Sequence, residues 1–249
     1  MSSHCFLLSE VVDLRYQRQI LMPEIGQAGQ EKLQAAKVLV VGAGGLGSPV
    51  LTYLAAAGIG HIIIVDYDVV AESNLNRQFL YGTKDIGRAK GFTAAEKLRS
   101  LNPDIDVTII SAKIDEENSM DIIRGINVVV DCVDSIATRL IVNSACLEQN
   151  IPLVEGGVCQ FYGYVMCIRR ESACLRCIDY RQEKKTANTP VIGCTAGVIG
   201  SLQANECIKI LLDIGEPLFS KMLTYDGLRN SFDLIELKKD DKCGEFHNT

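Results

Sequence analysis

The sequence predicts an α/β protein with a doubly wound, mostly parallel sheet, antiparallel strands towards the C-terminus and helices at the N-terminus. Three observations predict this fold class: short apolar runs of strand length, helical segments that alternate with them, and a glycine-rich turn after the first strand. The 249 residues suffice for one large domain with a sizeable core, so we expect residues 1–249 to form a single unit.

The N-terminal segment, residues 11–36, is predicted to form two short helices that are interrupted at Pro23 and Gly26. The pattern then changes, because Val38–Val41 is a continuous apolar run. Such a run is typical of a strand that is buried on both faces in a parallel sheet.

A helix and a second strand complete the first β-α-β unit. Ser48 can cap the helix, Pro49 suits its first turn, and Gly58 follows its expected last residue, Ala57. His61–Val65 is again a short apolar run, so we expect a parallel strand beside the first one.

The alternation continues along the chain, and the last segments favour antiparallel strands. Further helices are expected at Gly87–Leu101, Ala137–Gln149 and Val198–Leu212. Further strands are expected at Val107–Ile110, Asn127–Asp131, Pro152–Val154, Tyr162–Arg169, Lys221–Tyr225 and Ser231–Leu237. The polar stretch Glu171–Asn188 is predicted to be a long loop, and such loops in compact domains are usually functional or mobile.

The chain is acidic, with a formal net charge of −6 at pH 7. A protein that follows nucleic-acid phosphates needs a basic face, so we expect no nucleic-acid partner. The stretch Val38–Val65 has no Asp, Glu, Lys or Arg and is long enough to mimic a membrane span. Six glycines and Pro49 interrupt it, so we expect buried strands and a helix there, and no membrane partner.

The chain has ten cysteines, and its first residues lack the basic start and the apolar core of a secretion signal. We therefore expect a reducing, cytoplasmic compartment, in which cysteines serve as core residues, metal ligands or nucleophiles. The cysteines in apolar surroundings are predicted to be buried: Cys132, Cys146, Cys159, Cys167 and Cys207.

The turn Gly42–Gly47 fits the pattern G-x-G-x-x-G of a Rossmann-like nucleotide-binding turn. Glycines let the backbone approach phosphates closely, and the following helix adds its N–H donors and its dipole. Asp66 ends the next strand, where an acid that binds a ribose is expected. Taken alone, these residues favour NAD or FAD over ATP.

The next segment favours a triphosphate instead. Asn74–Gln78 is a polar cluster that contains Arg77, and Arg88 and Lys90 follow at a predicted helix start. Arginine binds phosphate through two parallel hydrogen bonds and lysine adds a point charge. The alternative is that Lys84, Arg88 and Lys90 form a solvated surface.

Asp131 and Asp134 follow a later strand, at the edge where ligands bind in open parallel sheets. A carboxylate there can hold Mg²⁺, which binds through one or two carboxylates and the substrate phosphates. The alternative for Asp131 is the N-cap of the following helix.

Taken together, the motifs resemble the ThiF/MoeB/HesA group, bacterial relatives of the ubiquitin-activating enzymes. The resemblance covers nearly the whole chain. The matching segments are Arg15–Gln19, Gly42–Gly47, Asp66–Asp68, Ser73–Gln78, Gly87 with Lys90, Asn102 with Pro103, Asp131–Asp134 with Arg139, Cys174 with Cys177, and Gly200–Ala204.

The resemblance implies an adenylyltransferase. It uses ATP and Mg²⁺ to adenylate the C-terminal carboxylate of a small ubiquitin-like sulfur-carrier protein that ends in Gly-Gly, and it releases pyrophosphate. The pathway would be that of thiamine, molybdopterin or a similar thiolated product. The nucleotide site then consists of Gly42, Gly44, Gly45, Gly47, Asp66, Asn74, Arg77, Gln78, Lys90 and Asp134.

The resemblance also implies a homodimer, because Arg18 is similar to an arginine that reaches into the partner's site. Arg77, Lys90, Asp134 and Arg18 are then the catalytic residues. The chain divides into a helical segment at about 11–36, a nucleotide-binding core at about 37–155, and a crossover loop with a carrier-binding part at about 156–249.

Cys174 and Cys177 have the spacing of half a tetrahedral Zn²⁺ site. The family closes this site with a second pair near the C-terminus, where this chain has Cys243 but Phe246 at the expected partner position. His247 is a candidate fourth ligand of a structural zinc ion, and an empty, degenerate site is the alternative.

Cys194 is a candidate nucleophile, because some relatives bind the carrier protein through a cysteine in this region. It precedes a predicted helix, whose N-terminus would favour a thiolate. The alternative is a packed residue at the helix start.

Other functions remain open at this point. The activated carboxylate could belong to a peptide C-terminus or to a tRNA, although the acidic balance argues against tRNA. The chain could also be an NAD-dependent dehydrogenase or an inactive scaffold, and the intact set of Arg77, Lys90 and Asp134 argues against the scaffold.

Overall fold

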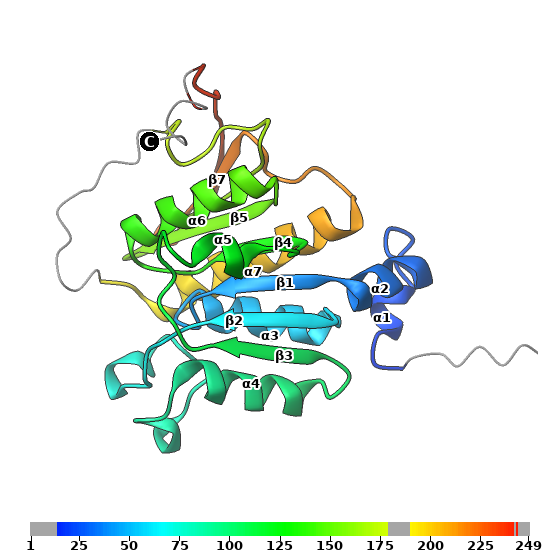
Figure 1. The fold of residues 1–249 in the computed structure, drawn as a ribbon, viewed down its shortest axis with the longest axis vertical. Helices are drawn as coiled ribbons and strands as arrows, with labels where there is room; N and C mark the ends of the chain where they lie inside the picture. Colours follow the sequence, from blue (N-terminus) through cyan, green and yellow to red (C-terminus); the bar gives the residue numbers. More distant parts are fainter. Residues whose placement is uncertain (1–13, 179–189, 242, 244–249) are drawn as a thin grey trace, which may run out of the picture.

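The computed structural model describes residues 14–178, 190–241 and 243, and it contains one eight-stranded sheet (Figure 1). The strand order is β3-β2-β1-β4-β5-β6-β7-β8, in which β3 to β5 pair in parallel and β5 to β8 pair antiparallel. The strands are β1 (Lys37–Val41), β2 (His61–Val65), β3 (Asp106–Ile110), β4 (Val128–Asp131), β5 (Leu153–Cys159), β6 (Tyr162–Ile168), β7 (Lys221–Asp226) and β8 (Ser231–Glu236). The predicted doubly wound sheet with antiparallel C-terminal strands is confirmed.

Helices cover both faces of this sheet. The face that carries Val38 and Val40 packs against α3, α4 and α7, and the face that carries Leu39 and Val41 packs against α6 and the cysteine-containing loop. Every position of β1 after Lys37 is therefore buried, which explains the continuous apolar run. The helices are α1 (Gln17–Ile20), α2 (Gly26–Ala35), α3 (Gly47–Ala57), α4 (Lys90–Leu101), α5 (Ser119–Ile123), α6 (Ile136–Gln149) and α7 (Gly193–Leu212), with 3₁₀ turns at Glu72–Asn74 and Thr83–Asp85.

Two helix starts differ from the prediction. α4 begins at Lys90 and not at Gly87, because Gly87 has a φ of +85° and Ala89 is extended in a bridge with Val69. α7 begins at Gly193, five residues before the predicted Val198, so the glycines in its first turns do not prevent helix formation. In addition, the prediction does not include the short helix α5, or the part of β5 after Val154.

The start of α3 also differs in detail. Leu46 occupies the N-cap position, and the Ser48 hydroxyl lies inside the first turn and donates to the Gly44 carbonyl at 2.8 Å. The helix ends as predicted at Gly58, whose φ is +82°.

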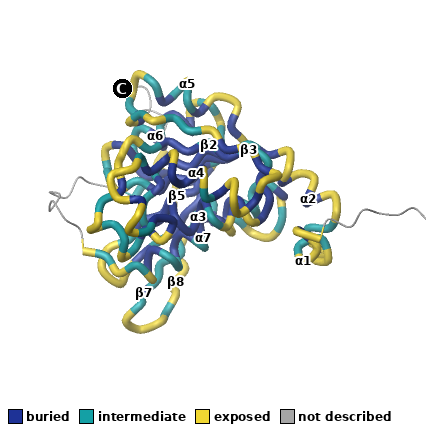
Figure 2. Tube along the Cα trace, turned by 90° about the horizontal axis from the view of Figure 1, so that it is seen from below, coloured by how far each residue is buried: buried dark blue, intermediate teal, exposed yellow. Residues whose placement is uncertain are grey.

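Among the described residues, no helix is both long and apolar enough to cross a membrane. The uncharged stretch Val38–Val65 is instead most of β1, then α3 and β2, and most of its residues are buried (Figure 2).

Candidate active site

The glycine-rich turn lies at the carboxyl edge of the sheet, where β1 and β4 end side by side. Gly42 has a φ of +96°, and a Cβ there would lie 2.9 Å from the Cys132 carbonyl oxygen. A Cβ on Gly47 would collide with the Gly42 carbonyl. At Gly44 and Gly45 a Cβ would approach side chains at 3.6 Å and no backbone, so these two glycines leave the turn open on its outer side.

Asp66 fixes the conformation of this turn. One carboxylate oxygen accepts the N–H of Ala43 and the other accepts the N–H of Asp68, each at 2.8 Å. Burial raises the pKa of Asp66 above its ordinary value, while these two hydrogen bonds lower it. The side chain predicted to bind ribose thus holds the glycine-rich turn in place.

Lys90 is brought to the same edge by the start of α4. It is only 5% exposed, and its Nζ lies 3.0 Å from Asp68 Oδ2. The surface alternative is therefore wrong for Lys90. Lys84 and Arg88 do lie on the solvated surface: Lys84 is exposed, and Arg88 is exposed and pairs with Glu96.

Tyr81 connects the two elements and was missed in the sequence. Its buried hydroxyl donates to the Ala43 carbonyl at 2.9 Å and lies 3.3 Å from the carbonyl of Lys90. Burial raises the pKa of this hydroxyl well above its ordinary value, so it stays protonated as a donor. No motif distinguishes a tyrosine of this kind from a core residue before the fold is known.

Arg77 faces the glycine-rich turn from the segment after β2. A Cβ on Gly45 would lie 3.6 Å from Arg77 Cγ, so backbone and side chain are neighbours. Its NH1 donates to the Ser73 carbonyl at 2.8 Å and to Asn76 Oδ1 at 3.0 Å, which leaves the rest of the guanidinium without a described partner. Gly193, at the start of α7, packs against Asn76 from the other side.

Gln78 is the strongest local sign of a missing ligand. It is 4% exposed, its amide lies beside Gly44, and its Oε1 has no hydrogen-bond partner among the described residues. A buried polar atom without a partner is costly and is usually satisfied by water or a ligand. Asn74, by contrast, accepts the N–H of Ala71 at 3.1 Å and caps its own turn.

The two aspartates at the end of β4, Asp131 and Asp134, lie in different environments. Asp131 is 0% exposed and points into the interior, so neither a metal site nor the N-cap role is available to it; Ser135 is the N-cap of α6. Asp134 is exposed at the edge of the site. Partial burial raises the pKa of Tyr67, and the charges of Asp68, Asp134 and Asp66 raise it further, which places these carboxylates around one tyrosine.

Arg18 is part of α1, which lies with α2 at the opposite edge of the sheet (Figure 1). Tyr16 is buried against Gly58 and receives a hydrogen bond from Asn102 Nδ2 at 2.7 Å, and Gln19 donates to the Ala57 carbonyl at 3.1 Å. Ala57 and Gly58 end the 11-residue helix α3 that begins at the glycine-rich turn, so about 16 Å of helix separates the two ends. Arg18 cannot reach the site of its own chain.

Cys194 is exposed in the first turn of α7, close to the Asn76–Arg77 segment that packs on Gly193. It lines a groove of about 540 Å³ between α3 and α7. The other residues of this groove are Pro49, Tyr53, Phe79, Gly197, Val198, Ser201 and Leu202.

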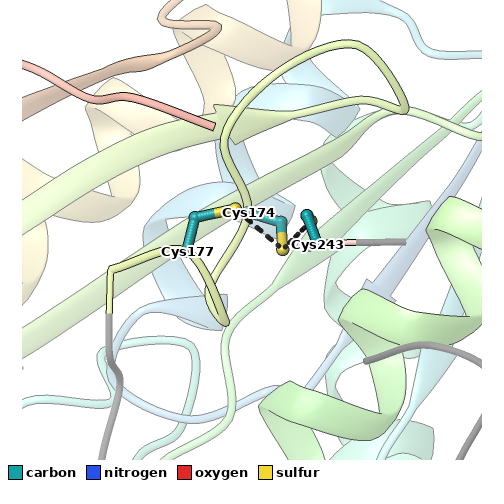
Figure 3. A group of neighbouring side chains, drawn as sticks. All are labelled: Cys174, Cys177 and Cys243. Carbon is teal, nitrogen blue, oxygen red and sulfur yellow. Dashed lines mark hydrogen bonds between the residues drawn. The ribbon is translucent and has the colours of Figure 1, made fainter. Parts of the chain in front are cut away.

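Cys174, Cys177 and Cys243 form a cluster beside α6, and their sulfur atoms all lie within 4.8 Å of one another (Figure 3). Cys174 Sγ is 3.7 Å from Cys177 Sγ and 3.4 Å from Cys243 Sγ. Burial raises the pKa of the Cys174 and Cys243 thiols, so a cation would be needed to make them thiolates. The proposed fourth ligand, His247, lies outside the described residues.

The other cysteine predictions hold with one exception. Cys132, Cys146, Cys167 and Cys207 are buried as predicted, but Cys159 is exposed. Cys159 is the last residue of β5 and lies at the hairpin between β5 and β6, opposite Tyr162.

The chain matches known proteins over nearly its whole length. The sequence profile of the ThiF family matches residues 16–245. The chain is 40% identical to the SAMP-activating enzyme E1 of Haloferax volcanii, covering 92% of this chain and 87% of that protein. It is also 40% identical to the sulfur carrier protein adenylyltransferase of Thermus thermophilus, covering 92% and 89% of the two chains.

A solved structure has the same fold. The structure of E. coli MccB with MccA-N7isoASN superimposes with a TM-score of 0.83 at 25% identity, over 92% of this chain and 74% of that one. With the profile match over residues 16–245 and the two relatives at 40% identity, the chain belongs to the ThiF family.

Proposed function

We propose that this protein uses ATP to adenylate the C-terminal carboxylate of a ubiquitin-like sulfur-carrier protein and releases pyrophosphate. One observation carries the proposal: Arg77 lies against the open glycine-rich turn, and Lys90, from a separate segment, pairs with Asp68, whose N–H is held by the same Asp66 carboxylate that holds the turn. The relatives named as a sulfur carrier adenylyltransferase and a SAMP-activating E1 support the carrier as substrate.

The chemistry needs charge neutralisation and alignment. The attacking carboxylate is ionised near pH 7, so no general base is required when it attacks the α-phosphate. In this proposal Gly45 borders the phosphates and Arg77 and Lys90 bind them, while Asp66 binds the ribose. Gln78 and Asn74 complete the polar lining. Gly42, Gly44 and Gly47 keep the turn free of side chains.

Asp134 is the proposed ligand of Mg²⁺, because it is the exposed carboxylate at the end of β4. The ion, when bound, would neutralise phosphate charge. Lys90 must exchange its present partner, Asp68, for a phosphate oxygen when the nucleotide enters.

The proposed active unit is a homodimer. Arg18 is exposed, makes no hydrogen bond or ion pair with a described residue, and sits on a firmly docked helix at the far edge. This placement suits delivery of a guanidinium to the site of a second copy.

The proposed carrier-binding surface is the C-terminal sheet, within the 156–249 part. The edge strand β8 is exposed along nearly its whole length and presents Phe232, Leu234 and Ile235 to solvent. An exposed apolar surface of this kind is typical of a protein-binding site. A Gly-Gly tail, which has no side chains, would then extend to the glycine-rich turn.

Cys194 is the proposed acceptor of the activated carrier, since it is exposed in the first turn of α7 near Arg77. Intact mass spectrometry after incubation with ATP and carrier should detect a covalent adduct that is lost in Cys194→Ser. A chain that stays unmodified under turnover would contradict this role.

We further propose that Cys174, Cys177 and Cys243 hold a structural zinc ion, with His247 as the fourth ligand. The purified protein is expected to contain about one zinc per chain. A chelator or Cys177→Ser should lower the melting temperature, because a structural zinc site contributes directly to folding. Cys159→Ser, a change of an exposed cysteine outside the cluster, is the matched control. Purified protein without stoichiometric zinc would refute the site.

The direct test of function is ATP–pyrophosphate exchange. Exchange is expected only when a ubiquitin-like protein ending in Gly-Gly is added, and not with a carrier that lacks these two residues. Exchange with a free peptide instead would favour the second candidate, the adenylation of a peptide C-terminus. NAD that copurifies with the protein would contradict both.

We place the reaction in the reducing cytoplasm, since the described cysteines are all free thiols.

A further inference from the structure

Behind the candidate site lies a buried cluster of charged side chains that the proposed chemistry does not use. Asp131 at the end of β4 and Glu155 in β5 are direct neighbours in the parallel register, and both are 0% exposed. Arg139 of α6, which is 5% exposed, pairs with Glu155 Oε1. Two carboxyl groups therefore face one guanidinium in the interior.

Hydrogen-bond donors reach only one oxygen of each carboxyl. Asp131 Oδ1 accepts the N–H of Val133 at 2.9 Å, and Glu155 Oε1 accepts from Arg139 and from the Tyr164 hydroxyl, the latter at 3.1 Å. Asp131 Oδ2 and Glu155 Oε2 are buried and have no donor among the described residues. The two side chains project from directly paired positions of adjacent parallel strands, so the two carboxyl groups are neighbours on the same face of the sheet.

Two ionised carboxylates only accept hydrogen bonds, so a direct hydrogen bond between them requires a proton on one of them. We propose that Asp131 and Glu155 share one proton, and that the resulting neutral unit with Arg139 positions the turn between β4 and α6. The unit then holds one negative charge, one positive charge and one proton, and each carboxyl oxygen has a partner.

The alternatives are costly. If both groups were ionised, the interior would hold an uncompensated negative charge, and if both were protonated, Arg139 would lose its counter-ion. Burial raises the pKa of both carboxyls, and that of Glu155 well above its usual range, although the charge of Arg139 opposes this. The two carboxyls therefore hold one proton between them.

The unit is placed to control the turn that carries Asp134. Arg139 donates to the Val133 carbonyl at 2.6 Å and to the Gly156 carbonyl at 2.7 Å, and Asp131 caps the Val133 N–H. Gln203 of α7 donates to the Asp131 carbonyl at 2.7 Å. Both the N–H and the carbonyl of Val133 are thus held by hydrogen bonds, one residue before the proposed Mg²⁺ ligand Asp134. Glu155 and Asp131 are positioning residues in this sense.

The test uses amide variants, because an amide replaces a shared proton with an N–H donor. Glu155→Gln can still accept from Arg139 and can donate to Asp131 Oδ2, and Asp131→Asn can donate to Glu155 Oε2 in the same way. Each single variant is expected to melt within about 3 °C of the parent. The double variant places two donors against each other and leaves Arg139 unpaired, so its melting temperature should fall by at least about 6 °C beyond the sum of the singles.

A spectroscopic measurement keeps the proposal testable if the double variant does not fold. At neutral pH the infrared spectrum of the parent should show the carbonyl stretch of a buried protonated carboxyl, and each single variant should lack it. Single variants that are as damaging as the double, or a parent without this band, would overturn the shared proton.

A third variant, Glu155→Leu, tests whether the unit positions the turn between β4 and α6. This test rests on the proposed function, because its measure is the Mg²⁺ dependence of exchange. Glu155→Leu removes the acceptor for Arg139, so the Mg²⁺ concentration for half-maximal exchange should rise about 10-fold. Glu155→Gln keeps an acceptor for Arg139 and should therefore keep the parental Mg²⁺ concentration. Nucleotide binding measured by calorimetry should show the same Mg²⁺ dependence. If the parent shows no exchange, the proposed function fails, while the melting and infrared results still decide the shared proton. An unchanged Mg²⁺ dependence in folded Glu155→Leu would overturn the positioning role.

Discussion

Replacing Arg77 by alanine is expected to lower carrier-dependent ATP–pyrophosphate exchange by about 10²–10³-fold, because the developing phosphate charge loses a fixed cationic partner. The guanidinium uses only NH1 in contacts with its own segment, namely the Ser73 carbonyl and Asn76 Oδ1. The Arg77 side chain lies against the open face of Gly45 through Cγ and Cδ, and its remaining guanidinium donors have no partner among the described residues, so they are available to a phosphate.

The fold should survive this change, since no core residue depends on the Arg77 side chain. Arg124→Ala is the matched control, because this exposed arginine pairs only with Asp121, in the helix α5 on the other face of the sheet. Circular dichroism and the melting temperature should be unchanged in both variants, and exchange should be lost only in the first. Near-parental exchange in Arg77→Ala would remove this residue from the site.

Arg18→Ala is expected to be equally inactive alone, yet to regain activity when mixed with Arg77→Ala. In a mixed dimer one of the two shared sites receives an intact Arg18 from one copy and an intact Arg77 from the other. With random exchange of subunits, roughly a quarter of the parental sites are restored.

The measurement is exchange activity as a function of the mixing ratio, after subunits have been allowed to redistribute. A double variant that carries both changes in the same chain is the control, because mixing it with itself restores nothing. Arg18→Ala that retains full activity, or a mixture that stays inactive, would show that the sites are not shared.

Much of the fold could be predicted because the parallel strands are buried on both faces and read as unbroken apolar runs. The glycine at the end of α3 marked the boundary correctly, since Gly58 adopts the left-handed conformation that ends a helix. The prediction that a helix starts at Gly87 is wrong for the same physical reason. The positive φ of Gly87 belongs to a turn that precedes the helix, and the helix itself begins at Lys90.

The start of α7 could not be read from local pattern. Gly193 and Gly197 have low helix propensity, but tertiary packing overrides it, because Gly193 lies against Asn76 where a side chain would not fit. This difference matters for function, since it moves Cys194 from a loop before the helix into its first turn.

For the site, sequence motifs identified the cationic residues but not what holds them. Asp68 and Tyr81, which position Lys90 and the glycine-rich turn, carry no recognisable spacing. Asp131 was a plausible Mg²⁺ ligand until the register of β4 and β5 placed it against Glu155. A pairing between strands 24 residues apart cannot be deduced from either segment alone.

The docking of α1 has a genetic consequence. Tyr16 occupies the space that a side chain on residue 58 would need, so a Gly58→Ala allele would displace α1 and with it Arg18, the residue proposed to serve a second copy, while its own glycine-rich turn stays intact. In a cell with two alleles, such a lesion would be rescued by an Arg77 allele and not by an Arg18 allele. Defects at the two edges of the sheet would then fall into two interallelic complementation groups, although both inactivate the same catalytic centre.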